Sequence, residues 1–272
     1  MISKFKSLRM IIILSLVGIV FFVAFFAPFL TPQDPYYSDL FRANQSPSAE
    51  HIAGTDSLGR DIFSRLILGT RASVLTALAL IIITAIVGVT LGMIAGYYGG
   101  KIDTLIMRAV DTMLSFPDLI LALAIIGIVG IGLIPAMGAI IAVSWAKYAR
   151  LTRSLVMKTK TSTFLVAATT NGTKKRKIIF SHILPNIIPQ IFVTAALDLG
   201  GMILTLASLS FLGFGILPPT PEWGYMLNEG RTSFLTAPWL IFYPGSAILT
   251  VVIIFNLFGD AMRDVFDTRT LS

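Results

Sequence analysis

The sequence contains no cysteine and few charged residues. Only 13% of its 272 residues are charged, against about a quarter in an ordinary soluble domain. Without cysteine, the chain can form neither a disulfide nor a thiolate metal site. Hydrophobic residues make up 55% of it, which is more apolar surface than a compact soluble fold of this size can hide from water. A bilayer can hide that surface, so the composition predicts an all-α integral membrane protein.

Several apolar runs are long enough to cross a membrane. The first follows Lys4, Lys6 and Arg9 and is uncharged over residues 10–33. It is longer than the core of a signal peptide, and no A-x-A cleavage site follows, so we interpret it as a retained helix. Four further stretches qualify or nearly do. They cover residues 72–100, 119–146, 187–217 and 232–259.

The stretch 119–146 decides the topology. As one span it would give five helices and would place residues 147–186 on the side opposite the N-terminus. That segment holds nine Lys and Arg and no acidic residue, and basic loops stay in the cytoplasm. We therefore predict that 119–146 belongs to two helices that turn near Gly130, Gly132 and Pro135. The third helix then starts early, around 102–116, and the fourth ends near Lys147 and Arg150, which can snorkel to the interface.

The resulting prediction is six transmembrane helices with both termini cytoplasmic, in a single domain over residues 1–272. It places 16 of the 21 Lys and Arg inside. An extracytoplasmic loop is expected at 34–71 and a cytoplasmic one at 147–186. A net charge of +7 could indicate a nucleic-acid-binding protein. Because the basic residues gather on one side of the apolar segments, we expect no nucleic-acid partner.

Two features inside the spans are candidates for function. Gly88, Gly92, Gly96 and Gly100 recur every four residues and would share one helix face, where backbones can approach closely. That face serves either packing within the subunit or a subunit interface. Asp198 lies in the fifth span, and a carboxylate there costs roughly 2.5–3.5 kcal/mol. It therefore either serves the translocation pathway or makes a hydrogen bond between helices.

The sequence shows no recognisable catalytic, nucleotide or metal site. His51 and His182 fall on opposite faces of the membrane and cannot share a metal ion. The nearest approach to the phosphate-binding pattern G-x-x-x-x-G-K-[ST] is G-Y-Y-G-G-K-I at 96–102, where the spacing and the final residue both fail. No Ser/His/Asp set is assembled. We expect a protein that is not an enzyme and binds no cofactor itself, so that any ATP is hydrolysed by another chain.

Four groups of motifs occur in order along the chain. They are G-T-D-S-L-G-R-D-I-F-S-R-L at 54–66, A-A-T-T-N-G at 167–172 with H-I-L-P-N at 182–186, S-F-L-G-F-G-I-L-P-P-T-P-E-W-G at 210–224, and N-L-F-G-D-A-M-R-D at 256–264. Together they resemble the permease subunits of dipeptide, oligopeptide and nickel ABC importers, specifically the second of the two paired permeases. The likeness runs from about residue 34 to the C-terminus, with its core at 72–264.

This resemblance implies a type I ABC importer permease fold that works by alternating access in a bacterial or archaeal cytoplasmic membrane. The implied partners are a homologous second permease in a heterodimer, two cytoplasmic ATPases that bind ATP and Mg, and an extracytoplasmic substrate-binding protein. Membrane lipid surrounds the assembly. The cargo would be peptides or nickel and other metal chelates, and the sequence does not decide between them.

The resemblance also implies that a short helix at 164–172, beginning with Phe164 and Leu165, docks in an ATPase groove. The family pattern is E-A-A, three residues, Gly, nine residues, a hydrophobic residue, one residue, then Leu-Pro. The chain matches this pattern at Ala167, Ala168, Gly172, Leu184 and Pro185. It departs at Val166, where Glu is expected, and at His182, where an apolar residue is usual. Docking would then rest on packing and on the basic cluster 174–177, which the positive-inside rule alone also explains.

Two other classes of protein are alternatives. A secondary transporter working alone needs coupling charges at mid-bilayer, and only Asp198 qualifies. An intramembrane enzyme needs paired catalytic groups at one depth, which the sequence does not show. Co-purification with an ATPase would exclude both.

Overall fold

The computed structural model describes residues 2–266, with side chains from residue 8 onward. Residues 267–272, which include the C-terminus predicted to be cytoplasmic, and the side chains of Lys4 and Lys6 lie outside this description. Regular structure in the described residues is helical, apart from a single bridge between Thr55 and Asp61. The long helices are α1 Ile2–Leu30, α2 Ile62–Tyr98, α3 Gly100–Leu114, α4 Asp118–Val129, α5 Leu133–Lys160, α8 Leu184–Phe211 and α10 Trp239–Phe266. The shorter ones are η1 Leu40–Arg42, α6 Thr163–Thr170, α7 Lys175–Lys177, a π-helix at Ile178–Ile183, α9 Trp223–Gly230 and η3 Arg231–Ser233.

Four helical segments are long and apolar enough to cross a membrane. They lie at Leu8–Leu30, Ile62–Tyr98, Lys175–Phe211 and Trp239–Phe266. The pair α3 and α4 gives a fifth if the two count as one broken span, bent by 95°. Helix α5 is not among them, because Lys147, Arg150 and Arg153 lie along it. Length and composition thus give four or five spans in the described residues, where the sequence predicted six.

The predicted turn between the third and fourth helices is present. Helix α4 ends at Val129 and α5 begins at Leu133, and Gly130 and Gly132 have φ of 111° and 142°, which only glycine adopts without strain. The helix before that turn is broken, however. It bends at residues 115–117 because Pro117 disfavours helical geometry in the residue before it.

Both predicted long loops are shorter than expected. Helix α2 begins at Ile62, because the Asp61 carboxylate accepts a hydrogen bond from Ser64 N at 2.8 Å and caps the helix. Arg65 and Arg71 are therefore helical rather than part of a 34–71 loop. In the region 147–186, α5 continues to Lys160, and α6, α7 and the π-helix occupy most of the remainder.

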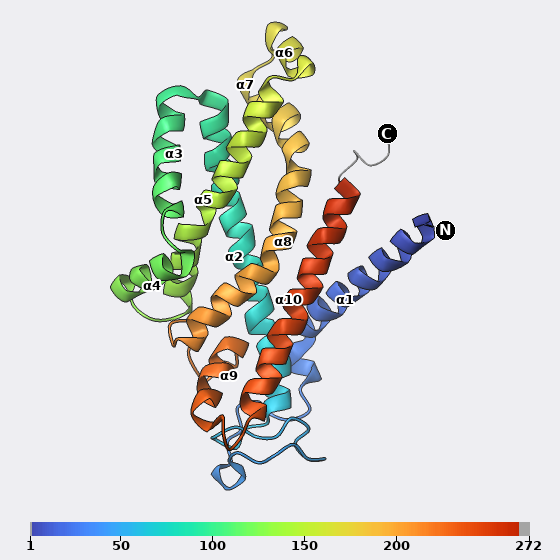
Figure 1. The fold of residues 1–272 in the computed structure, drawn as a ribbon, viewed down its shortest axis with the longest axis vertical. Coiled ribbons are helices and arrows are strands. Elements are labelled where there is room, and N and C mark those ends of the chain that lie inside the picture. The colour runs from blue at the N-terminus through green and yellow to red at the C-terminus, as the bar shows by residue number, and fades with distance from the viewer. Residues whose placement is uncertain (1, 267–272) are drawn as a thin grey trace.

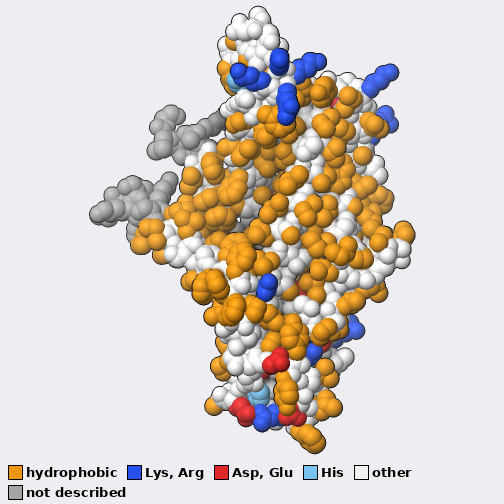
Figure 2. Space-filling model, turned by 180° about the vertical axis from the view of Figure 1, so that it is seen from behind, with side chains coloured by type: hydrophobic (Ala, Val, Ile, Leu, Met, Phe, Trp, Pro, Cys, Tyr) orange, Lys and Arg blue, Asp and Glu red, His pale blue; other side chains and the backbone are white. Residues whose placement is uncertain are grey.

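The helices form an elongated bundle (Figure 1). Helix α2 packs along α5, α10 along α8, and α1 against α2 and α10. We call the end that holds residues 31–61 and α9 the loop end, and the opposite end the α6 end. Helix α1 begins and α10 finishes in the half of the molecule toward the α6 end (Figure 1). Figure 2 shows hydrophobic side chains over the middle of one face, Lys and Arg at the α6 end, and a mixture of acidic and basic groups at the loop end.

A glycine face joins α2 to α5. A Cβ atom on Gly88 would lie 2.5 Å from the Trp145 carbonyl oxygen, and one on Gly96 would lie 2.9 Å from Val156 Cβ. Gly92, between them, is equally crowded. Gly100 does not share this face, because it begins α3 with a φ of +57° and has open space around it. The face therefore serves packing within this subunit.

Candidate functional site

The short helix α6 stands at one end of the molecule (Figure 1). The Leu165 side chain of this helix is buried and belongs to the same apolar core as Ile178 and Ile183. Phe164 and Val166, by contrast, are about half exposed, at 48% and 53%. Ala167 is exposed and Ala168 partly so. One residue therefore anchors the helix while a small apolar surface remains uncovered in this chain.

Gly172 ends α6 with a φ of +73°. Its N–H donates to the Thr169 carbonyl at 3.0 Å, and the N–H of Thr173 donates to the Ala168 carbonyl at 3.2 Å. This pair of bonds is the Schellman motif, which places a left-handed residue directly after a helix. The short helix expected at 164–172 therefore ends where the family pattern places its glycine.

The segment after α6 enters the membrane helix α8 through the π-helix. The N–H of Leu184 reaches back five residues to the Ile179 carbonyl. Pro185 has no N–H, and its ring would clash with the carbonyl four residues earlier, which is a physical reason for the wider turn here. His182 is half-buried, and its carbonyl accepts from Asn186 Nδ2 at 2.6 Å. Leu184 and Pro185 thus belong to a continuous helix rather than to a loop.

Asp198 lies on α8 and bridges to α5. Lys147 Nζ is 2.6 Å from Asp198 Oδ1, and the Tyr148 hydroxyl donates to Asp198 Oδ2 at 3.1 Å. The predicted hydrogen bond between helices is therefore present, and the structure adds a basic partner. Lys147 does not end the helix at an interface, because α5 continues for more than three turns beyond it.

Two more ion pairs tie α5 to α3. Arg153 forms a bidentate pair with Asp103 at 2.5 and 2.6 Å, and Arg150 pairs with Asp111 at 2.5 Å. In the sequence these arginines indicate only topology, because the spacing of Asp103 and Asp111 along α3 does not match that of Arg153 and Arg150 along α5.

At the loop end, the E-W-G motif joins three helices. Glu222 caps α9 by accepting from Gly224 N and Tyr225 N, each at 2.9 Å, and also accepts from the Ser73 hydroxyl of α2 at 3.1 Å. Trp223 Nε1 donates to the Leu66 carbonyl of α2 at 3.1 Å. Gly224 sits so close to α8 that a Cβ would lie 2.3 Å from the Ala207 carbonyl oxygen. Burial raises the pKa of the Glu222 carboxyl, against the lowering effect of the bonds it accepts.

The G-T-D-S-L-G-R-D motif holds a buried charge network beside α9. Asp56 pairs with Arg60 at 2.6 Å, and Glu229 pairs with both Arg60 and Arg65 at 2.8 Å. The Arg65 side chain is only 1% exposed. Burial lowers the pKa of Arg60, but Asp56 and Glu229 outweigh it, so the net shift is upward. We call this network of Asp56, Arg60, Arg65 and Glu229 the outer clamp. The outer clamp was not predicted from the sequence, although clustered charges in a charge-poor chain are a signal for such pairs.

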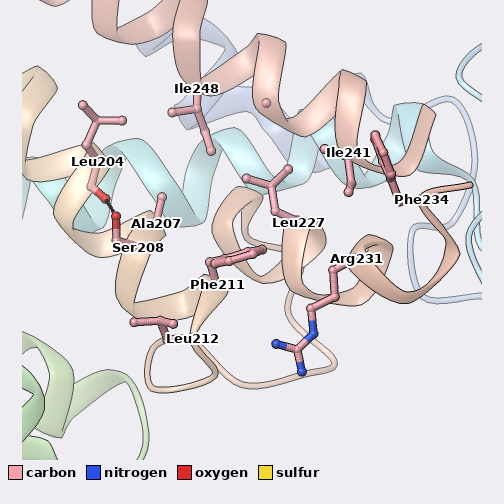
Figure 3. A pocket seen from close by; sticks show the side chains of 11 residues that line it. Leu204, Ala207, Ser208, Phe211, Leu212, Leu227, Arg231, Phe234, Ile241 and Ile248 are labelled. Carbon is pink, nitrogen blue, oxygen red and sulfur yellow. Dashed lines mark hydrogen bonds between the residues drawn. The ribbon is translucent and has the colours of Figure 1, made fainter. Parts of the chain in front are cut away.

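An open pocket of about 690 Å³ lies between α8, α9 and α10. Its lining is mostly apolar, with Leu204, Phe211, Leu227 and Ile248 among the contributing residues (Figure 3). Ser208 does not offer its hydroxyl to the pocket, because that group donates to the Leu204 carbonyl at 2.7 Å. Arg231 points its guanidinium away from Ile248 (Figure 3).

Metal ligands do not gather in the described part of the chain. No group of three His, Asp or Glu side chains there lies close enough to hold a metal ion. His51 instead contacts Asp61 at 3.0 Å at the loop end.

A helical bundle with several apolar spans, a charge pair between two of its helices and an exposed short helix at its basic end defines a multi-pass membrane protein. Residues 88–272 match the model of the family described as the binding-protein-dependent transport system inner membrane component. The chain belongs to this family.

Relatives of similar length carry transport names. The chain is 43% identical over 270 residues to the dipeptide transport system permease protein DppC of Alkalihalophilus pseudofirmus, covering 99% of this chain and 88% of the relative. It is 42% identical over 251 residues to the glutathione transport system permease protein GsiD of Pectobacterium atrosepticum, covering 92% and 83%. It is 39% identical over 270 residues to the nickel transport system permease protein NikC of Escherichia coli K12, covering 99% and 96%.

The fold is similar to that of a solved ABC importer. A chain of the inward-facing MetNI methionine ABC transporter aligns with a TM-score of 0.61 and 17% identity, covering 75% of this chain and 97% of that one. The predicted type I ABC importer permease fold is thus supported, and so is a permease function within a multi-part transport system. The alternative of a secondary transporter that works alone is not supported.

Proposed function

We propose that this chain is one transmembrane subunit of an ATP-driven importer in a bacterial or archaeal cell membrane, and that it moves peptides or metal chelates by alternating access. The observation that carries the proposal is α6, a short helix with a buried anchor and an exposed apolar face at the basic end of the molecule. Relatives with peptide, glutathione and nickel transport names support the cargo class.

In this proposal, α6 docks in a groove of a cytoplasmic ATPase. Phe164, Val166 and Ala167 offer small and apolar contacts, since the acidic residue usual at position 166 is missing. Leu165 ties α6 to the core, and α6 contacts both α5 and the π-helix. A displacement of α6 would therefore pass into α5 and into α8, the two helices that Asp198 bridges.

The proposed topology has six crossings, with α3 and α4 together as the third and α5 as the fourth. The α6 end faces the cytoplasm, since basic residues gather there. Reporter fusions test this directly. A fusion after Ser272 should be active in the cytoplasm and one near Gln45 should be active outside, and cytoplasmic activity at Gln45 would refute the topology.

The proposed assembly contains a second, homologous permease, two ATPases that hold ATP and Mg, and an extracytoplasmic binding protein that delivers the cargo. This chain supplies no nucleotide site of its own. The open pocket of Figure 3 offers an unpaired apolar surface for the second permease.

Purification of the tagged subunit from its native membrane tests the proposal. We expect an ATPase with a Walker motif to co-purify and the reconstituted complex to take up labelled substrate only with ATP. Purification without any ATPase, under conditions in which the subunit stays folded, would contradict it.

A further inference from the structure

Lys147 has an unusual position for a charged residue. Its side chain is 58% exposed, yet it lies at the middle of α5 rather than near an end. The ammonium is held there by Asp198 at 2.6 Å, so it does not reach along the helix toward a membrane surface. Charged side chains within a span face the bundle interior, a partner or a watery cavity.

Contacts with α2 show the depth of this group. Tyr148, the next residue along α5, lies against Gly88, where an added Cβ would be 2.5 Å from Tyr148 Cβ. Gly88 is near the centre of the uncharged run 72–100. Lys147 is therefore level with the uncharged run of α2 rather than beyond its end.

Contacts with α10 show the depth of Asp198. Leu197, next to Asp198, lies against Gly259 of α10, where an added Cβ would be 2.6 Å from a Leu197 methyl carbon. One turn before Gly259, Phe255 packs on Phe21 with ring centroids 5.8 Å apart. Phe21 is at the centre of the uncharged run 10–33, whereas Gly259 is the last residue of the uncharged run 232–259, so Asp198 lies between the centre of the apolar band and its edge toward the α6 end.

The hydrogen bonding of the pair is unequal. Asp198 accepts from two donors, Lys147 and Tyr148, and its side chain is only 21% exposed. Lys147 has three N–H donors, and Asp198 is the one hydrogen-bond acceptor recorded for them in the described structure. The remaining donors are available on the exposed side, where they can bind an acceptor from outside this chain.

We propose that Lys147 is an anion-binding residue of the translocation pathway and that it receives a carboxylate group of the cargo. This inference rests on the proposed permease function. When a carboxylate binds, the ammonium is shared with it or transferred to it, while Tyr148 still donates to Asp198. In the empty state the two side chains carry no net charge together. An ammonium does not attract a free divalent cation. It does attract the carboxylate of a peptide or of a chelator that holds a metal.

The absence of cysteine in the chain allows a direct test. Ser144 lies one turn before Lys147, so Ser144→Cys places the chain's single thiol on the same face of α5. The purified complex in lipid is treated with two methanethiosulfonates, the anionic sulfonatoethyl and the cationic trimethylammonioethyl reagent. Modification of this chain is followed by mass spectrometry. We expect both reagents to react. We also expect Lys147 to raise the rate ratio, which is the reaction rate of the anionic reagent divided by that of the cationic one.

Three added variants sharpen the test. Lys147→Met with Asp198→Asn removes both charges without leaving one unpaired. The two opposite charges partly cancel at the thiol, so the rate ratio should fall about twofold, the size expected for a positive charge roughly 6 Å away and its negative partner about 2 Å farther in water. Lys147→Arg should keep the ratio of the parent. Ile86→Cys, at a similar depth on the side of α2 away from Gly88, should not react with either reagent.

Two results would overturn the inference. If Ser144→Cys reacts with neither reagent, lipid or the second permease covers this face. If the ratio is unchanged when both charges are removed, the site has no preference for anions. Either result can occur in a complex that still co-purifies with its ATPase and hydrolyses ATP, so it is distinguishable from failure of the proposed function.

Discussion

Replacing Gly92 with alanine tests the packing of α2 against α5. The new Cβ would lie 2.4 Å from the Ala149 carbonyl oxygen and 2.7 Å from Thr152 Cβ. Neither atom can rotate away, so the two helices must separate. Overpacking of this kind costs about 1–3 kcal/mol, and the ~1 kcal/mol that alanine gains over glycine inside a helix offsets only part of it.

The assay is thermal unfolding of the purified subunit in detergent. We expect the midpoint for Gly92→Ala to fall by roughly 2–6 °C. The matched control is Gly201→Ala on α8, where nothing lies within 4 Å of the new Cβ, and its midpoint should stay equal or rise. Equal midpoints for the two variants would refute the close packing inferred for the glycine face.

Three further perturbations address the other sites. Glu229→Gln leaves the buried Arg65 without its closest charge partner and should lower the free energy of unfolding by about 3–5 kcal/mol in chemical denaturation. Glu50→Gln, which alters the exposed ion pair of Glu50 with Arg42, should leave the unfolding curve unchanged, and similar curves for the two variants would argue against the outer clamp. Gly172→Val should abolish ATP-driven uptake while the subunit stays in the membrane, and Gly172→Asn should retain uptake because Asn tolerates positive φ; full uptake by the valine variant would remove α6 from coupling. Asp198→Leu should insert normally and lower uptake, and wild-type uptake would exclude Asp198 from the mechanism.

The features predicted best from the sequence were those that depend on local chemistry. The turn at Gly130 and Gly132 and the stop at Gly172 were visible because glycine adopts backbone angles that other residues avoid. The main spans were also predictable from local sequence. Each apolar run has to form the hydrogen bonds of its own backbone when it lies in lipid, and a helix does so. The break at Pro117 is also a local feature, but the long apolar stretch after it favoured an unbroken helix, so the bend was not predicted.

What could not be predicted depends on contacts between distant residues. Arg60 and Glu229 are 169 residues apart and Lys147 and Asp198 are 51 apart, and no periodicity along the chain connects them. The sequence identified Asp198 as costly in a membrane but not the lysine that compensates for it. Counting Lys147, Arg150 and Arg153 as loop residues ended α5 too early, because Lys and Arg are good helix formers and acidic residues of α3 and α8 pair with them here.

The length of α2 has a geometric consequence for the whole assembly. Its 37 residues extend about 55 Å, whereas the hydrocarbon core of a bilayer is about 30 Å thick. The helix must therefore project beyond the lipid tails, and α5 stays beside it as far as Lys160, whose Nζ bonds to the Tyr97 carbonyl at 2.8 Å. In the topology proposed above, the two helices would hold α6 beyond the lipid headgroups, where a water-soluble ATPase could bind it without entering the membrane. Shortening both helices by one turn would bring α6 about 5 Å closer to the membrane.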